Sequence, residues 1–249
     1  MNPYLAARPR AGAALRLFCF HHAGAGAMTF ARWQARMGPG VSVLPVRLPG
    51  RETRLNEPRI TDAEELVDEL ERHLAPLLET PYVLYGHSLG ALVANRLAAH
   101  RARAGSRPPE ELVVGACRAP HEPNPLHGAA ELDDEQMLRM LQGFGGVPEA
   151  MLERPDWLRT MLATMRADLQ LAGGLRTLGA HALPCPVRAY AGRDDRMAPA
   201  ASMQGWARYT ASAFRFHTVA GGHFFVRDRE LPDLLGRSLT LDGPLSLVG

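Results

Sequence analysis

The chain has 249 residues, of which 46% are hydrophobic, and this is enough for one sizeable α/β domain with or without an insertion. Its formal net charge of +2 gives no sign of a nucleic-acid-binding surface, and the absence of lysine excludes a lysine Schiff base and a P-loop lysine. No apolar run has the length of a signal peptide or of a membrane span. We therefore expect a cytoplasmic protein without membrane contact.

Short apolar runs rich in β-forming residues predict six strands. They span residues 15–21, 41–48, 82–85, 111–117, 187–191 and 214–219. Apolar residues at helical spacing predict helices over residues 62–78, 89–105 and 199–209. Helices alternate with strands from residue 41 onward, so we expect a parallel sheet with crossover helices. Within it, Pro45 favours a sheet edge or a bulge, and the Pro- and Arg-rich N-terminal start is expected to be loose.

Residues 118–186 separate two predicted strands and contain no strand-like run. Helical patterns over 132–142, 149–152 and 156–175 instead predict an inserted helical lid, which we assign to residues 121–182 of a single domain spanning 1–249. The lid is rich in methionine, whose adaptable side chain suits a pocket that accepts an acyl chain. The candidates for that pocket are Met137, Met140, Phe144 and Met165. For any one of them, packing within the core of the lid is an equally good explanation.

The stretch Gly86-His87-Ser88-Leu89-Gly90 fits the G-x-S-x-G pattern and lies between a predicted strand and a predicted helix. In that context the glycines relieve crowding, and a strained turn holds the serine Oγ above the sheet. The N–H groups of the following helix then face developing negative charge. The alternative is an ordinary turn whose serine caps the helix. The surrounding elements, with an acid and a histidine downstream, favour Ser88 as a nucleophile.

An acid and a histidine follow the last two predicted strands. Asp194 and Asp195 both follow residues 187–191, and Asp195 is favoured because the spacing G-x-x-D puts it on the turn just past the strand. His223 follows two glycines just past the last strand and is the candidate base. The order Ser88, Asp195, His223 matches the nucleophile, acid and base of α/β-hydrolases, which predicts that fold. His87 is expected to pack on the elbow.

The loop after the first strand, HHAGAGAMTF, is made of small residues that allow close approach to a substrate carbonyl. In α/β-hydrolases one oxyanion N–H comes from such a loop and the other from the residue after the nucleophile. This predicts the backbone N–H groups of Ala23 and Leu89 as an oxyanion hole, although an ordinary flexible turn is the alternative for the loop alone. The residues specify acyl transfer and need no metal or bound cofactor, but they do not distinguish esters, thioesters and amides.

The chain resembles the stand-alone type II thioesterases of polyketide and nonribosomal peptide synthesis over nearly its whole length. Five segments carry the resemblance: His21 to Gly26 in the loop, Gly86 to Ala91 at the elbow, Gly115 to Pro120 before the lid, Arg166 to Asp168 in the lid, and Gly221 to Phe225 around the histidine. Two residues depart from the family pattern. His21 replaces a usual proline and Ala25 a usual glycine.

The resemblance implies hydrolysis of acyl groups from the phosphopantetheine arm of an acyl or peptidyl carrier protein, removing stalled or wrong groups. On this basis the expected substrate-binding residues are His22, Met137, Met140, Phe144, Met165 and Phe224. Acidic carrier surfaces suit arginines near the site entrance, and the candidates are Arg47, Arg51, Arg54 and Arg118. We expect a monomer that binds no nucleic acid.

Two other classes of function fit the same residues less well. One is a medium-chain fatty-acyl thioesterase or a carboxylesterase with the same triad. The other is a non-catalytic binding protein on a hydrolase fold, against which a complete Ser-Asp-His set argues. The three cysteines, Cys19, Cys117 and Cys185, are widely spaced, and we expect them to be reduced thiols.

Overall fold

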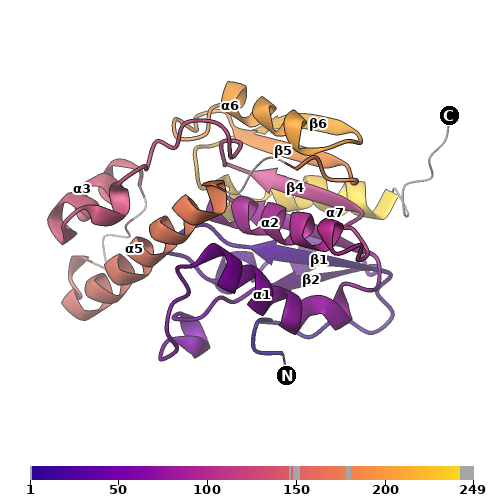
Figure 1. Cartoon of the computed structure of the whole chain (residues 1–249), viewed down its shortest axis with the longest axis horizontal. Helices are drawn as coiled ribbons and strands as arrows, with labels where there is room; N and C mark the ends of the chain where they lie inside the picture. The colour runs from indigo at the N-terminus through magenta and orange to yellow at the C-terminus, as the bar shows by residue number, and fades with distance from the viewer. Residues whose placement is uncertain (1, 146, 148–151, 178–180, 242–249) are drawn as a thin grey trace.

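The computed structural model describes residues 2–145, 147, 152–177 and 181–241, and these form a parallel sheet with helices on both faces (Figure 1). The strand order is β2-β1-β3-β4-β5-β6, and each neighbouring pair is parallel. The strands are β1 Leu15–Phe20, β2 Val41–Pro45, β3 Tyr82–His87, β4 Glu111–Gly115, β5 Val187–Gly192 and β6 Phe214–Val219. The predicted parallel sheet is confirmed, and the strand ends differ from the predicted ones by a few residues.

Six α-helices and several short 3₁₀ segments connect the strands in the described part of the chain. The α-helices are α1 Ala63–Leu74, α2 Leu89–Arg103, α3 Asp134–Gly143, α5 Pro155–Thr177, α6 Ala200–Gln204 and α7 Glu230–Leu241. The 3₁₀ segments are η1 Ala27–Phe30, η2 Gln34–Arg36, η3 Glu52–Arg54, η4 Ala75–Leu77, η5 Ala129–Glu131, η6 Gly205–Tyr209 and η7 Phe225–Arg227. In Figure 1, α1, α2 and α5 lie in front of the sheet and α7 lies behind it.

The central strand β3 packs against both helical layers. Leu84 belongs to the core on the α1 and α2 side, whereas Val83 and Tyr85 belong to the core on the α7 side. This division follows from the two-residue repeat of a strand, which sends successive side chains to opposite faces. The sheet is therefore buried on both sides, as expected for parallel strands covered by helices.

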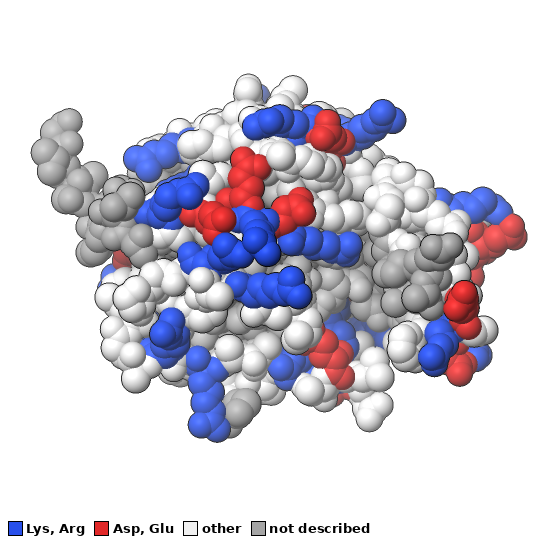
Figure 2. Space-filling model, turned by 180° about the vertical axis from the view of Figure 1, so that it is seen from behind, with Lys and Arg blue, Asp and Glu red and all other residues white. Residues whose placement is uncertain are grey.

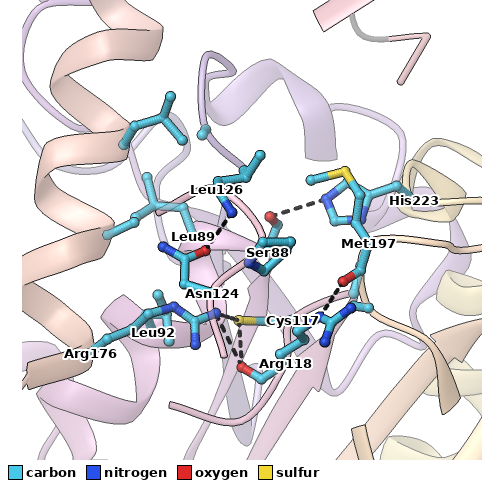
Figure 3. Close-up of a pocket in the computed structure, with 16 residues that line it drawn as sticks. Ser88, Leu89, Leu92, Cys117, Arg118, Asn124, Leu126, Arg176, Met197 and His223 are labelled. Atoms are coloured by element: carbon cyan, nitrogen blue, oxygen red, sulfur yellow. Dashed lines mark hydrogen bonds between the residues drawn. The ribbon is translucent and has the colours of Figure 1, made fainter. Parts of the chain in front are cut away.

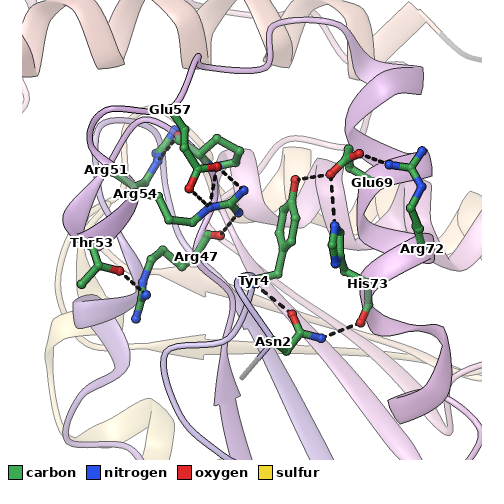
Figure 4. Close-up of polar contacts among 11 residues, drawn as sticks. Asn2, Tyr4, Arg47, Arg51, Thr53, Arg54, Glu57, Glu69, Arg72 and His73 are labelled. Carbon is green, nitrogen blue, oxygen red and sulfur yellow. Dashed lines mark hydrogen bonds and ion pairs between the residues drawn. The ribbon is translucent and has the colours of Figure 1, made fainter.

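The start of the chain is anchored rather than loose. Tyr4 and Leu5 are buried, and Leu5 forms an antiparallel bridge with Val46 beside β2. The Tyr4 hydroxyl donates to Glu69 Oε2 at 3.1 Å, and the Arg54 guanidinium lies 4.2 Å from the centre of the Tyr4 ring (Figure 4). The prediction of a loose start is wrong for these residues because their apolar side chains complete the core at the sheet edge. As Pro45 suggested, β2 is an edge strand of the sheet.

The segment between β4 and β5 is helical, as predicted, and in its described residues it holds no strand. Its main elements are α3 and α5, which share a small apolar core of their own. The C-terminal part of α5 packs on α2 and α1, whereas α3 and the start of α5 project beyond the sheet (Figure 1). Residues 149–151 of the second predicted helical pattern, with Met151, lie outside the described residues.

Helix α7 covers one face of the sheet and was not predicted. It contains Pro232 and Gly236, which weaken a helical pattern. Gly236 lies so close to η2 that an added Cβ would meet the Arg36 carbonyl oxygen at 2.2 Å, which explains why glycine stands there. In the part of the chain that the structure describes, no helix is long and apolar enough to cross a bilayer.

The three cysteines are free and buried, as predicted. Burial raises the pKa of the Cys117 thiol to about 11 and that of the Cys185 thiol to about 12. These thiols therefore stay protonated near neutral pH and do not act as nucleophiles.

Candidate active site

The site lies where the strands of the parallel sheet end. The register pairs Phe20 with Gly86 and His87 with Gly115, so the carboxyl ends of β1, β3 and β4 lie side by side. The turns that follow these strands, together with those after β5 and β6, meet at this edge. Sites in open parallel sheets form at such edges because the loops after the strands converge there.

The turn after β3 holds Ser88 in a strained conformation, with φ 54° and ψ −116°. Only three non-glycine residues of the described chain have a positive φ, and such a backbone marks functional sites more often than ordinary turns. The flanking residues must be glycines, because a side chain at either position would collide with neighbouring backbone. A Cβ at Gly86 would meet the Gly90 carbonyl oxygen at 2.1 Å, and one at Gly90 would meet the Phe20 carbonyl oxygen at 2.1 Å. Ser88 is thereby lifted above the strand ends.

The predicted histidine lies within hydrogen-bond distance of both the predicted acid and this serine, so it links the two. Ser88 Oγ lies 3.1 Å from His223 Nε2, and His223 Nδ1 lies 2.9 Å from Asp195 Oδ2. Asp194 is exposed on the same turn, and its backbone N–H donates to the Gly221 carbonyl. Of the two acids that the sequence offered, the structure brings only Asp195 to His223.

The environment of Asp195 keeps its carboxylate charged. Burial raises its pKa, but the hydrogen bond and charge of His223 together with the backbone N–H groups of Ala198 and Met197 outweigh this and lower it below the ordinary value. Both amides donate to Oδ1, at 3.0 and 2.8 Å, and leave Oδ2 for the histidine. A charged, fixed carboxylate favours the His223 tautomer with a proton on Nδ1 and a free lone pair on Nε2 facing the serine.

His87 lies under the site, on β3, and holds the backbone of His223. Its Nε2 is 2.7 Å from the His223 carbonyl oxygen and its Nδ1 is 2.9 Å from the Tyr85 hydroxyl. A carbonyl only accepts, so His87 Nε2 carries the proton and Nδ1 accepts from Tyr85. Burial and the neighbouring His223 hold the pKa of His87 well below its usual range, so the ring is neutral. His87 packs on the elbow, as expected, and does not face Ser88.

Several backbone polar groups of the loop after β1 form hydrogen bonds within the loop or with Asp168. The His22 carbonyl accepts from His21 Nδ1 at 2.9 Å and from the Ala25 N–H at 3.2 Å. The Ala23 carbonyl accepts from His22 Nδ1 at 3.0 Å, and the Gly24 N–H donates to an Asp168 oxygen at 2.8 Å. By contrast, the N–H of Ala23 has no acceptor among the described residues.

The Leu89 N–H, at the start of α2, also has no acceptor among the residues described. Ala23 and Leu89 line one pocket together with Ser88 and His223. Two free N–H groups beside a serine are the arrangement that an oxyanion hole requires. The predicted assignment of these two amides is compatible with their position.

A buried ion pair that the sequence did not reveal fixes this loop to helix α5. Arg51, in the loop after β2, pairs through both Nη atoms with Asp168 of α5, at distances of 2.8 and 3.0 Å. The same guanidinium donates to the Ala25 carbonyl at 2.9 Å. Asp168 Oδ2 thus accepts from both Arg51 Nη1 and the Gly24 N–H, while Oδ1 accepts from Arg51 Nη2. The Arg-Ala-Asp segment was noted in the sequence, but nothing there paired its acid with Arg51.

A cavity of about 220 Å³ opens beside Ser88 under the helical segment. Five of the six predicted substrate-binding residues line it: His22, Met140, Phe144, Met165 and Phe224. Met161 and Leu126, which were not predicted, also line it. Met137 does not, because it is fully buried in the small core that α3 and α5 share. For Met137 the alternative explanation, packing within the core of the helical segment, is therefore correct.

His22 lines this cavity with a neutral ring. Because its Nδ1 donates to a carbonyl, its Nε2 carries a lone pair, and this atom is buried without a partner among the described residues. Burial lowers the pKa of His22 to about 4, so the ring is neutral. The His22 ring lies 5.1 Å from that of Phe224 and is fixed by it.

A smaller pocket of about 50 Å³ extends from Ser88 toward α5 and the turns after β4 and β5 (Figure 3). Two arginines point into it from opposite sides. Arg118 donates to the Met197 carbonyl at 2.7 Å, and Arg176 donates to the Arg118 and Ala119 carbonyls at 3.4 and 3.3 Å. These bonds hold together the segments that frame the pocket.

The arginines that were expected to face a carrier protein are engaged elsewhere. Arg51 and Arg54 are buried, the first on Asp168 and the second on Glu57. Arg47 pairs with Glu52 at 3.1 Å and donates to the Thr53 hydroxyl (Figure 4), and Arg118 lines the inner pocket. The sequence could not separate them from exposed arginines because charge alone does not report burial.

The arrangement suits acyl transfer. It combines a serine on a strained elbow, a histidine oriented by a charged carboxylate, two free N–H groups and an adjoining apolar cavity. A nucleophile, a base with its orienting acid, and donors for an oxyanion are the parts that such chemistry needs.

Comparison with known proteins agrees with this chemistry. A family model described as a thioesterase domain matches residues 15–238. The gramicidin S biosynthesis protein GrsT of Aneurinibacillus migulanus is 30% identical over 223 residues, which cover 90% of this chain and 87% of that protein. The medium-chain S-acyl fatty acid synthase thioesterase of Rattus norvegicus is 30% identical over 222 residues, covering 86% and 82%.

A solved structure resembles the whole fold. The type II thioesterase BorB from the borrelidin biosynthetic cluster superposes with a TM-score of 0.83 at 31% sequence identity, covering 94% of this chain and 96% of that one.

Proposed function

The chain belongs to the thioesterase family and is a hydrolase of thioesters, and on that premise we propose that Ser88, His223 and Asp195 carry out the hydrolysis through an acyl-enzyme. The observation that carries this proposal is the unbroken chain of contacts from Asp195 through His223 to Ser88. It is supported by the strained elbow, which exposes the serine, and by the burial of Asp195.

In the first half-reaction, Ser88 Oγ attacks the thioester carbonyl while its proton passes to His223 Nε2. The carbonyl oxygen becomes negative and accepts hydrogen bonds from the Ala23 and Leu89 N–H groups. The carbon–sulfur bond then breaks, and the thiol leaves with the proton from His223. Water, activated by the same histidine, attacks the Ser88 ester in the second half-reaction and releases the acid.

The substrate class that fits best is an acyl group on the phosphopantetheine arm of a carrier protein. GrsT and BorB, which resemble this chain over nearly its full length, are named for the biosynthesis of gramicidin S and borrelidin. We assign this chain the corresponding editing role, in which it removes stalled or wrong acyl groups from acyl or peptidyl carriers. The helical segment over residues 121–182 acts as the lid whose cavity receives the acyl group.

A medium-chain fatty-acyl thioesterase is the second candidate. Two observations favour it: the rat enzyme is as similar in sequence as GrsT, and the cavity is lined by methionines that can adapt to a flexible alkyl chain. The two candidates share their chemistry and differ in the acyl group and its carrier.

One experiment tests the proposal. The hydrolysis of one acyl group is measured on a carrier protein, on free pantetheine and as an oxygen ester, for wild type and Ser88→Ala. We expect the carrier-bound thioester to react fastest and Ser88→Ala to abolish its turnover. Turnover of the oxygen ester alone would contradict the proposed substrate, and unchanged hydrolysis by Ser88→Ala would contradict the proposed mechanism.

A further inference from the structure

Arg227 lines both the cavity beside Ser88 and a second, outer groove. This outer groove has a volume of about 530 Å³ and runs along η1, η2 and the start of α7. Arg227 lines the groove and also lines the cavity that contains Ser88 and His223. It therefore lies between the outer groove and the cavity that contains the serine.

The guanidinium of Arg227 is held in place by an aromatic ring. It lies 4.6 Å from the centre of the Phe224 ring, which in turn lies 5.3 Å from the ring of His223. Among the described residues no carboxylate lies within ion-pair distance of Arg227, and partial burial lowers its pKa from the ordinary value. A stacked guanidinium without an acidic partner keeps its N–H groups available for an anion.

The groove around Arg227 is mainly basic. Arg32 and Arg229 also line it without an ion pair to any described residue, whereas Arg36 pairs with Asp233 at 3.4 Å. Asp228 is the one acid in the lining. Figure 2 shows the face that α7 covers, over which basic side chains are widely spread, with acidic ones among them. The lining therefore favours an anionic ligand.

The substrate that we have proposed carries an anion at the required end. A phosphopantetheine arm has its thioester at one end and its phosphate at the other, and two amide bonds separate them. With the thioester at Ser88, the arm must leave the cavity toward the surface. Arginine matches phosphate because its planar fork can donate two parallel, charge-assisted hydrogen bonds.

We propose that Arg227 binds the phosphate of the phosphopantetheine arm and that the basic groove beyond it receives the arm's attachment to its carrier. This inference rests on the proposed function. It replaces Arg47, Arg51, Arg54 and Arg118, which the structure shows to be paired or turned inward, as the basic group that faces the substrate's anion.

The test compares two small substrates that differ only in the phosphate, octanoyl-pantetheine and octanoyl-4′-phosphopantetheine. For wild type we expect kcat/KM to be about 10-fold higher for the phosphorylated one, the effect of one charge-assisted contact. In Arg227→Met the ratio of the two kcat/KM values falls to about 1, whereas Arg227→Lys retains part of the preference. The preference of the wild type weakens as salt is raised.

Arg103→Met is the matched control, because Arg103 is exposed at the opposite end of α2 from Ser88 and keeps the preference intact. Equal turnover of both substrates by wild type would overturn the phosphate site while leaving the proposed function in place. An equal loss on both substrates in Arg227→Met would also overturn it, since the residue would then act on the fold or the chemistry. No turnover of either substrate by wild type would overturn the proposed function, and the inference with it.

Discussion

The strand ends and the helical segment above them are built in opposite ways. At the strand ends, Asp195 and His223 each make several hydrogen bonds, and the carbonyls of His22, Ala23 and Ala25 in the loop after β1 all accept hydrogen bonds. In the helical segment, side chains such as Phe144 and Trp157 are exposed, the latter by 59%. We call the strand-end loops with Ser88, Asp195 and His223 the floor, and the segment with α3 and α5 the cover. In our proposal the fixed floor does the chemistry and the adaptable cover receives the acyl group.

Helix α5 belongs to both regions. Met161 and Met165 on its first half line the cavity, whereas Asp168, one turn further on, is bonded to Arg51 and the Gly24 N–H. The Met165 methyl group also lies close to Gly24, only 2.7 Å from the position that a Cβ on Gly24 would take. The cover is therefore anchored to the floor through the hydrogen bonds of Asp168. Variants in the floor and variants in the cover should therefore separate effects on the chemistry from effects on substrate preference.

The largest effect is expected on the floor, at Asp195. Asp195→Asn should lower kcat on the order of 10⁴-fold, because an amide no longer holds the His223 tautomer that can take a proton from Ser88. Asp194→Asn is the matched control and should stay within about 2-fold, since Asp194 is exposed on the same turn. Steady-state thioester hydrolysis measures both. A large loss in Asp194→Asn with little change in Asp195→Asn would contradict the assignment.

The buried histidines of the floor make its stability depend on pH. Burial lowers the pKa of His21 to about 3 and of His22 to about 4, and holds that of His87 well below its usual range. In the unfolded chain each of these imidazoles takes up a proton near pH 6.5, whereas in the folded chain it stays neutral at that pH. The stabilisation is therefore complete above about pH 6.5 and is lost as the pH falls.

When the pH falls from 7 to 5.5, each of these histidines lowers the free energy of unfolding by about 1.3 kcal/mol, and the three together lower it by about 4 kcal/mol. Urea unfolding at the two pH values measures this difference in the free energy of unfolding. His22→Asn, which keeps a donor for the Ala23 carbonyl, should remove about a third of it. A free energy of unfolding that does not change between the two pH values would contradict neutral, buried histidines.

A smaller effect is expected where cover and floor meet. Asp168→Asn should lower kcat about 10- to 100-fold, because the loop that presents the Ala23 N–H loses its charged anchor. It should also lower the melting temperature, since the Arg51 charge is left buried and unpaired. The double variant Arg51→Met, Asp168→Leu should recover stability but not kcat. Recovery of both would show that the pair serves only the fold.

The smallest effect is expected in the cover. Met161→Ala enlarges the cavity and should shift kcat/KM a few-fold toward longer acyl chains, as measured with a series of acyl-pantetheines. Met137→Ala is the control from the core of the same segment. It should leave the preference unchanged and cost about 2–5 kcal/mol of stability. A preference shift in Met137→Ala alone would reverse the roles given to the two residues.

Short-range patterns predicted much of the fold and of the site. The strand before Ser88, the helix after it and the two glycines are adjacent in sequence, and the order of Ser88, Asp195 and His223 follows from the order of the strands. The sheet, the helical insertion and the positions of these three residues could therefore be inferred without coordinates. Their catalytic roles remain a prediction.

Long-range and side-dependent features could not be inferred. Arg51 and Asp168 are 117 positions apart, and a single sequence does not pair them. Met137 and Met165 are equally apolar, but α3 and α5 turn the first into their shared core and the second toward the cavity. Helix α7 was missed because a proline and a glycine interrupt its pattern, although Leu231 and Leu235 are fully buried.

The most direct test of the central claim is to trap the acyl-enzyme. Wild type is mixed with octanoyl-pantetheine, quenched with acid within one turnover and digested, and the peptides are weighed by mass spectrometry. The account predicts an octanoyl group, replacing one hydrogen, on the peptide that contains Ser88, and no adduct in Ser88→Ala. An octanoyl group on another residue, or thioester hydrolysis that persists in Ser88→Ala, would contradict it.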